Sequence, residues 1–441
     1  MAPTYIHTDN GETPPTAVDA IATPPRRAVL FTRLIAMMLL EFVVFGSWFA
    51  TVGLVLSSNG LADAIAPIYS LAAVAAIVSP MFLGALADRY MPSQRVLGIA
   101  HLAGGAIMFT LPGLVNAANG ALVLGVAFLY MVFFQPTLSL ANAIAFRHLG
   151  GDTQLFPYIR VTGTLGWVIA GLLVGALGLS ASSNIFIVTA IASVLLGVYA
   201  FTLPNTPPPA KGKKFSLIDV VGARAFVLFR HHDFRVFFIC ASLTSVSLGV
   251  YNTWASPYLG ALGIENVAGV LAIGQACEVL LILTIPWVLK RIGMKWSLLA
   301  GMMMWGVRFA LFIVAADTAP WWAILAVALQ GICNDFFLIL GAMYIDWVAP
   351  EQVRAQAQGM LILVISGVGA LIGASLSGAV YGHFVAPVAD AAGPTAWWPV
   401  FLICIISATI TSTVWLLFFK QRRGELVTRL ELSAAQTEAG E

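Results

Sequence analysis

Charge is scarce in this sequence. Acidic and basic residues make up only 10% of the 441 residues, whereas 60% of the residues are hydrophobic. Soluble domains carry roughly 25% charged residues. The composition therefore excludes an ordinary soluble protein, and it predicts a chain that crosses a membrane many times.

The sequence also lacks the motifs of metal, disulfide and catalytic sites. Its four cysteines fall inside apolar runs without metal-ligand spacing, so we interpret them as packing residues. The six histidines form no HExxH or similar set. No Ser–His or paired-aspartate motif indicates an intramembrane enzyme, and no basic aromatic patch indicates a nucleic-acid partner. Residues 1–25 are polar and Pro-rich, unlike a signal peptide. We therefore expect no enzyme activity, metal or cofactor.

Twelve apolar runs are long enough to cross a membrane, which takes about 20 helical residues. The runs cover residues 33–57, 64–87, 95–115, 119–146, 155–178, 183–203, 235–259, 265–289, 296–316, 320–345, 355–382 and 396–419. Pro136 inside the fourth run should kink that helix. We predict an all-α polytopic membrane protein with twelve transmembrane helices.

One long polar link divides the twelve runs into six and six. It is rich in proline and basic residues, which is typical of a linker between domains. This organisation predicts two six-helix bundles with a site between them. The predicted parts are a disordered tail at 1–30, bundles at 31–204 and 235–420, a linker at 205–234 and a tail at 421–441. Within the linker, we expect a helix on the membrane surface at 216–230.

Lys and Arg residues are confined to alternate loops, which predicts the orientation of the chain. Basic residues occur before the first run, in the central linker and after the twelfth run. The loops of the opposite side contain no Lys or Arg and carry Asp63, Glu265, Asp317 and Asp390. Both termini and the linker are therefore expected in the cytoplasm.

The link between the second and third runs reads GALADRYMPSQR. It resembles the cytoplasmic-loop signature of the major facilitator superfamily, in which a small residue allows close helix contact and Asp and basic residues lock a gate. The resemblance assigns gating roles to Gly84, Asp88 and Arg89. The alternative is that this segment is only a short solvated turn without a gating role.

Two acids lie inside apolar runs. Glu278 falls in GQACEVLLILTIPWVLKR, one helical turn after Gln275, and Asp335 falls in the tenth run. A charged side chain inside a membrane segment is costly, so it usually lines a pathway or a site. A purely structural buried pair is the alternative. Acids in such surroundings suit proton coupling.

Other polar and aromatic residues share helix faces. Glu41, Phe45 and Trp48 lie at i, i+4 and i+7 in the first run. On other helices, polar and aromatic residues with a possible role in a site are Arg160, Thr164 and Trp167 in the fifth run, Tyr251, Asn252 and Trp254 in the seventh, and Gln330 and Asn334 in the tenth. We expect His101 to be a structural hydrogen-bond partner and Arg308 to pair with an acid that holds helices together.

Several stretches together resemble the bacterial nucleoside:proton symporters of the major facilitator superfamily. They are FGSWFATVG, PTLSLANAI, FPYIRVTGTLGW, GQACEVLLILTIP, VRFALF, NDFF and VRAQAQGM, spread over about residues 33–420. The resemblance implies two six-helix bundles with alternating access, a central nucleoside site and uptake driven by proton entry. Residues that match the family's polar site in kind are Arg160, Thr164, Asn252, Gln275, Glu278 and Asp335.

The sequence departs from that family at several site positions. Trp167 stands where the family has a smaller aromatic, and Gly249 where it has a glutamine. Gln330 and Asn334 replace two aromatics, so the base-stacking surface is expected to be rebuilt from Trp167, Tyr251 or Trp254. Glu41 stands where the family has a neutral glutamine, and this extra carboxylate is a candidate to alter proton coupling or to accept a substrate hydroxyl.

The leading hypothesis is a proton-coupled importer of nucleosides in the bacterial inner membrane. Its predicted substrate-binding residues are Arg160, Thr164, Trp167, Tyr251, Asn252, Gln275, Glu278, Gln330, Asn334 and Asp335, and its predicted proton-coupling residues are Glu278, Asp335 and Glu41. The expected partners are a small solute and membrane lipid, and the expected state is a monomer. A symporter of a sugar or another hydroxylated metabolite would use nearly the same polar groups, so the sequence leaves this alternative open. An exporter of lipophilic compounds or a membrane sensor is a more distant alternative.

Overall fold

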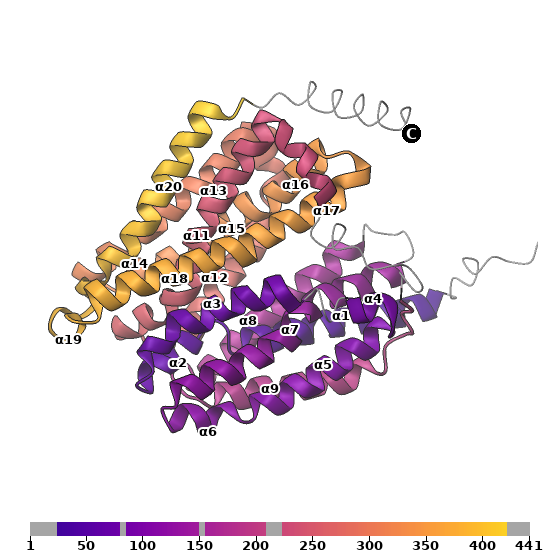
Figure 1. Ribbon diagram of the computed structural model, residues 1–441, viewed down its shortest axis with the longest axis horizontal. Helices are drawn as coiled ribbons and strands as arrows, with labels where there is room; N and C mark the ends of the chain where they lie inside the picture. Colours follow the sequence, from indigo (N-terminus) through magenta and orange to yellow (C-terminus); the bar gives the residue numbers. More distant parts are fainter. Residues whose placement is uncertain (1–23, 80–84, 150–154, 209–222, 421–441) are drawn as a thin grey trace, which may run out of the picture.

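The structure, a computed structural model, describes residues 24–79, 85–149, 155–208 and 223–420 (Figure 1). These parts are almost wholly helical and contain no strand. Within the described residues, ten helices are long and apolar enough to span a membrane, and two shorter apolar helices, Ile185–Ala200 and Val267–Ile282, complete twelve spans. The predicted number and order of helices are confirmed, and the chain is an integral membrane protein.

The first bundle contains six spans, several of them built from more than one helical piece. Its elements are α1 (Pro24–Gly46), α2 (Val52–Ser58), η1 (Ala62–Ala64), α3 (Ile65–Ser79), α4 (Ala85–Arg89), α5 (Ser93–Met108), α6 (Leu111–Asn116), α7 (Gly120–Leu149), α8 (Phe156–Ala176) and α9 (Ile185–Ala200). The first span is interrupted by turns at residues 47–51. The fourth span, α7, continues unbroken through Pro136.

The second bundle is more fragmented. Its elements are η4 (Ala223–Arg230), α11 (His232–Ala261), α12 (Val267–Ile282), α13 (Ile285–Asp317), α14 (Trp321–Ala328), α15 (Gln330–Asn334), η5 (Asp335–Ile339), α16 (Leu340–Val348), α17 (Glu351–Ile362), η6 (Leu363–Gly369), α18 (Ala370–Val380), η7 (Tyr381–Val385), α19 (Ala389–Ala392), η8 (Gly393–Trp397) and α20 (Trp398–Phe418). Three of these, η5, η6 and η7, are π-helical and lie in the tenth and eleventh spans.

The eighth span differs from its prediction as one continuous helix. It ends as α12 at Ile282 and resumes at Ile285 as the start of α13. The chain then turns at Gly293, whose φ of 76° favours glycine, and continues as the ninth span. The predicted turn between residues 289 and 296 therefore exists, although both spans share the label α13.

Parts of the predicted domain plan fall outside the described residues. These are the tail up to residue 23, residues 80–84 with Gly84, residues 150–154, residues 209–222 of the linker and the tail from residue 421. The first helix already begins at Pro24, before the predicted boundary at residue 31. Of the expected linker helix at 216–230, the described part is the short 3₁₀ helix η4.

The two bundles meet through helices that come from both halves of the chain. In Figure 1 the N-terminal bundle, coloured indigo to magenta, lies beside the C-terminal bundle, coloured pink to yellow. Helix α8 packs against α12, and α3 packs against α18. From these contacts the ribbons diverge toward the end that carries α4 and α17 (Figure 1).

Small residues allow the bundles to approach closely on the side opposite the basic loops. A Cβ added at Gly171 of α8 would lie 2.9 Å from the Cβ of Ala272 on α12, and one at Gly53 would lie 3.0 Å from the ring of Pro257. The hydroxyls of Ser70 and Ser375 lie 3.1 Å apart across the same boundary. We call these contacts the seam. They join the two bundles on this side of the molecule.

We expect the variant Gly171→Val to open the seam, because its side chain cannot fit against Ala272. Maleimide labelling of a Ser70→Cys variant, with the four native cysteines replaced, should then accelerate at least about tenfold, corresponding to ~1.4 kcal/mol. Gly125→Val on α7 is the matched control, since a Cβ there meets no atom within 4 Å. Unchanged labelling in Gly171→Val would show that the seam does not depend on this contact.

Candidate functional site

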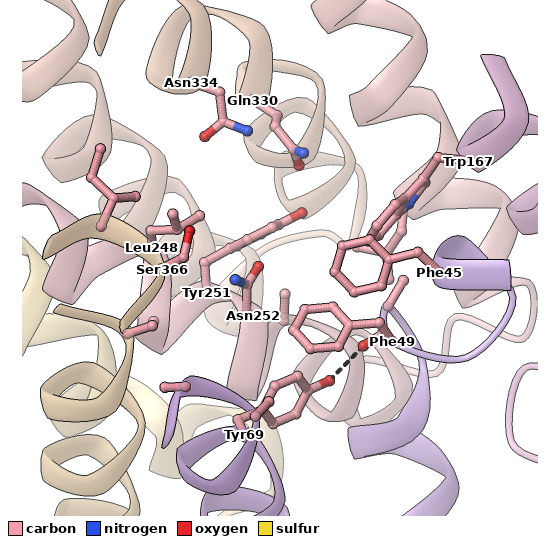
Figure 2. Close-up of a pocket in the computed structure, with 18 of the residues that line it drawn as sticks. Phe45, Phe49, Tyr69, Trp167, Leu248, Tyr251, Asn252, Gln330, Asn334 and Ser366 are labelled. Atoms are coloured by element: carbon pink, nitrogen blue, oxygen red, sulfur yellow. Dashed lines mark hydrogen bonds between the residues drawn. The ribbon is translucent and has the colours of Figure 1, made fainter. Parts of the chain in front are cut away.

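A cavity of about 270 Å³ lies between the two bundles and is lined by residues from both. Small-molecule sites usually have volumes of roughly 300–1,000 Å³, so this one suits a small solute. Of the ten predicted substrate-binding residues, six line the cavity: Trp167, Tyr251, Asn252, Gln275, Gln330 and Asn334. Figure 2 shows that the side chains from the two bundles face each other across it.

The N-terminal bundle contributes an aromatic wall, which we define as Phe45, Phe49, Tyr69 and Trp167 (Figure 2). The ring centroids of Phe45 and Trp167 lie 4.6 Å apart, and those of Phe45 and Phe49 lie 4.8 Å apart. Tyr69 packs edge-on against Phe49 at 5.2 Å. Such tilted and edge-on pairs hold aromatic rings in fixed positions.

The break in the first span brings Phe49 into this wall. Helix α1 ends at Gly46 and α2 begins at Val52. At this break the Tyr69 hydroxyl on α3 donates a 2.8 Å hydrogen bond to the Phe49 carbonyl. Phe45, Phe49 and Tyr69 were not predicted as site residues. The i, i+4 spacing of the two phenylalanines was visible, but their depth in the structure was not.

The C-terminal bundle contributes a polar wall. We define it as Tyr251, Asn252, Gln275, Gln330, Asn334 and Ser366, which come from α11, α12, α15 and η6. The buried hydroxyl of Tyr251 has no hydrogen-bond partner within the described residues. Amides and hydroxyls offer both donors and acceptors, so this wall can bind a polar uncharged group in several ways.

Glu278 lies behind the polar wall rather than in it. Its Oε2 accepts a 3.1 Å hydrogen bond from Nδ2 of Asn334, and the Asn334 side chain itself lines the cavity. Gly331 makes this contact possible, because a Cβ there would lie only 2.9 Å from Cα of Glu278. The absent side chain lets α15 approach α12.

Asp335 follows directly on Asn334 and begins the π-helix η5. It is buried, and its Oδ2 has no hydrogen-bond partner within the described residues. It lies near enough to Glu278 for the two carboxyl groups to interact electrostatically. Neither acid lines the cavity. A π-helical turn at such a residue often marks a functional site.

Arg308 was expected to pair with an acid, but the structure shows neutral partners. Its guanidinium lies 3.5 Å above the ring of Tyr251 and donates a 3.1 Å hydrogen bond to Oε1 of Gln330. It is fully buried, and in the described chain its Nε and Nη1 have no partner. The stacking on Tyr251 compensates part of the cost of burying the charge.

Arg160 and Thr164 precede Trp167 on α8 and do not line the cavity. Arg160 is exposed, stacks on Phe42 with 4.5 Å between its Cζ and the ring centroid, and interacts electrostatically with Glu278. Thr164 is half-buried. Both lie nearer than Trp167 to the start of α8, on the side of the basic loops.

The suggestion that Trp254 forms a stacking surface for a base is wrong. Its side chain is only 1% exposed and donates a hydrogen bond to the Ser377 hydroxyl. Its ring stacks on that of Tyr381, with 4.1 Å between the ring centroids. Tyr251 lines the cavity, but Arg308 covers one face of its ring. Trp167 does lie in the aromatic wall.

Glu41 lies inside the N-terminal bundle, away from the cavity, which contradicts the idea that it accepts a substrate hydroxyl. It is 0% exposed. Its Oε2 lies 2.9 Å from Nε2 of His101, and its Oε1 accepts a 2.6 Å hydrogen bond from Thr137. The other ring nitrogen of His101 lies 3.1 Å from the Ser193 hydroxyl. His101 thus has the hydrogen-bonding position that was expected of it.

The predicted gating residues are only partly described. Asp88 and Arg89 end the short helix α4, and Gly84 precedes the part of this segment that is described. Their gating role stays a prediction.

Two six-helix bundles around a cavity with polar groups define the class of protein as a membrane transporter with its site between the bundles. Comparisons with known proteins agree. The chain is 33% identical to YegT of Escherichia coli (strain K12) over 402 residues, covering 88% of this chain and 94% of that protein. It is 29% identical to the xanthosine permease of the same organism over 406 residues, covering 88% and 95%.

Structural similarity is equally extensive. The crystal structure of the nucleoside transporter NupG matches 89% of this chain and 100% of its own, with a TM-score of 0.78 and 27% identity. The family model of the nucleoside H+ symporters matches residues 29–424. The chain therefore belongs to the nucleoside H+ symporter family, as the sequence resemblance predicted.

We expect Glu41 to stabilise the N-terminal bundle. Glu41→Leu leaves His101 and Thr137 without their partner and should cost about 1–3 kcal/mol of stability, whereas Glu41→Gln keeps two polar atoms and should cost less. The thermal midpoint of the purified protein in detergent measures this difference. Proton dependence of transport should survive in Glu41→Gln. If transport persists there without proton dependence, Glu41 is a coupling residue after all.

Proposed function

We propose that this protein imports nucleosides together with protons by alternating access. The observation that carries this proposal is the opposition of an aromatic wall and a polar wall across one cavity, with two acids directly behind the polar wall. The names of the xanthosine permease and of NupG support nucleosides as the substrate class.

The two walls match the two halves of a nucleoside. A base has a flat face that stacks on aromatic rings, and Phe45, Phe49 and Trp167 offer such rings on one side. A sugar has hydroxyls that bond to amides, which Asn252 and Gln275 offer on the other side. The base-stacking surface therefore lies on the N-terminal bundle.

Proton coupling is assigned to Glu278 and Asp335. In the outward-open state one of these carboxylates takes a proton, the nucleoside enters between the bundles, and the bundles rock against each other. Substrate and proton are then released on the inner side. Arg160 and Thr164 lie on α8 along the route from the cavity to the basic side, where they would meet the substrate as it leaves.

Lys and Arg are confined to alternate loops. This pattern supports an orientation in the bacterial inner membrane in which both termini lie in the cytoplasm. With that orientation the seam closes the outer side, so the described conformation faces inward. The cavity forms within one chain, which supports a monomer surrounded by lipid.

Uptake into proteoliposomes tests the function. Radiolabelled uridine and adenosine should accumulate when an inward proton gradient is imposed and not when a protonophore removes it. A sugar such as maltose should not compete. Accumulation that ignores the gradient would rule out symport, and competition by sugar alone would favour the sugar alternative.

The role of Glu278 is tested in the same assay. Glu278→Gln should abolish gradient-driven accumulation while nucleoside binding is retained, because the amide cannot take up and release a proton. Glu265→Gln, at an exposed acid at the start of the eighth span, is the matched control and should behave as wild type. Gradient-driven accumulation by Glu278→Gln would remove Glu278 from the coupling mechanism.

The aromatic wall is tested by Phe49→Ala. Stacking of a base on an aromatic ring contributes about 1–3 kcal/mol, so nucleoside affinity should fall roughly 5- to 150-fold. Phe49→Tyr should keep most of the affinity, and Phe109→Ala, on a half-exposed ring outside the cavity, should have no effect. Equal affinities of Phe49→Ala and wild type, measured by isothermal titration calorimetry, would place the base elsewhere.

A further inference from the structure

Two amides of α15 line the cavity and also contact charged side chains that do not line it. Gln330 and Asn334 are four residues apart, so they share one face of the helix, and both line the cavity. Each also holds a charged side chain that lies outside the cavity. Gln330 accepts a hydrogen bond from Arg308, and Asn334 donates one to Glu278, both at 3.1 Å.

Asn334 is thus in contact with both the substrate space and a proton-binding carboxylate. Glu278 does not line the cavity, whereas the residue that donates a hydrogen bond to it does. A substrate that binds in the cavity can therefore influence Glu278 through Asn334 without touching the carboxylate.

The chemistry of the amide makes this contact sensitive to the proton. An ionised carboxylate only accepts hydrogen bonds, so Asn334 must turn its Nδ2 toward Glu278. Its Oδ1, buried and without a partner in the described chain, is left as the acceptor on its other side. A protonated carboxyl group has one O–H donor. It can therefore donate to Oδ1 once the amide has rotated by half a turn, which leaves the NH₂ group on the other side.

Other charged and titratable groups also face Glu278. They are Arg160 on α8, Tyr251 on α11, Arg308 on α13 and Asp335 on η5. All four remain in place when only residue 334 is changed. A substitution of Asn334 therefore isolates the contribution of the amide from that of the surrounding charges.

We propose that Asn334 couples substrate binding to the protonation of Glu278 by exchanging a hydrogen-bond acceptor for a donor on the side of its amide that faces away from Glu278. The proposal rests on the proposed function, since it requires a proton-coupled substrate in this cavity. The resemblance described above places an aromatic residue at this position, and an aromatic ring cannot exchange donor and acceptor in this way. Asn334 is a positioning residue that acts through Glu278.

Nucleoside affinity as a function of pH tests the proposal, because proton and substrate binding influence each other reciprocally. Affinity of the purified full-length protein is measured by calorimetry from pH 5.5 to 8.5. Wild type should change at least about fivefold across this range, the lower limit of typical coupling between two sites. Asn334→Leu should bind more weakly, and its affinity should change with pH by a clearly smaller factor than that of wild type.

Asn252→Leu is the matched control. It removes the same side chain from the same cavity, and the hydrogen bond on Glu278 stays intact. Its affinity should fall while the fold-change with pH stays that of wild type. If Asn334 had only a structural role, Asn334→Leu and Asn252→Leu would both lower nucleoside affinity. The fold-change of affinity with pH would then be that of wild type in both variants.

A double-mutant comparison adds a second measure. If Asn334 acts through Glu278, Asn334→Leu should have little further effect on the pH profile in a Glu278→Gln background. Thermal midpoints verify folding, and Asn334→Met replaces Asn334→Leu if the latter is unstable.

The outcomes separate the two proposals. A wild type that binds nucleoside with no dependence on pH and takes it up without a gradient would overturn proton coupling itself, and with it any role for Asn334. A wild type with pH-dependent affinity and an Asn334→Leu variant with the same dependence would overturn only the role of Asn334.

Discussion

The cost of placing charge out of water is the constraint on which the interior of this protein depends. A buried charge must be paired, hydrogen-bonded or neutralised. The N-terminal bundle meets this requirement by enclosing Glu41 with His101 and Thr137. In the C-terminal bundle the charged groups contact neutral partners instead. Arg308 stacks on a tyrosine ring and donates a hydrogen bond to an amide, and Glu278 accepts a hydrogen bond from a second amide. Groups held in this looser way are able to change partners, which a transporter requires of its coupling residues.

The same contrast extends to the backbone. The aromatic wall comes from the N-terminal bundle, where rings packed at fixed angles form a surface for a flat ligand. Four of the six residues of the polar wall come from spans interrupted by breaks and π-helical turns, at Ile282, Asp335 and Leu363, and the aromatic wall has one such break after Gly46. Such interruptions in a membrane helix are tolerated where they line a cavity. The N-terminal bundle thus provides a rigid platform, and the C-terminal bundle carries the adaptable polar chemistry.

Sequence alone predicted the twelve helices, the family and most of the polar wall, because membrane length and polar residues in apolar runs are strong local signals. It could not predict how deep each side chain lies. Glu41, Phe45 and Trp48 share one helix face in the sequence, yet Phe45 lines the cavity while Glu41 and Trp48 are enclosed by their own bundle. Phe49 escaped prediction because its place depends on the break after Gly46. The neutral partners of Arg308 could not be predicted because they come from other helices.

The π-helical turn at Asp335 has a consequence for the register of the tenth span. A π turn closes hydrogen bonds five residues apart instead of four, so it accommodates an extra residue. Before this turn, Gln330 and Asn334 face the cavity. After it, Tyr344 packs against Phe237 inside the bundle, with 4.7 Å between the ring centroids. Deletion of one residue here would rotate the part of the tenth span before the π turn by about 100° relative to the part after it. The π turn thus sets which face of the tenth span meets the cavity before it and which face packs inside the bundle after it.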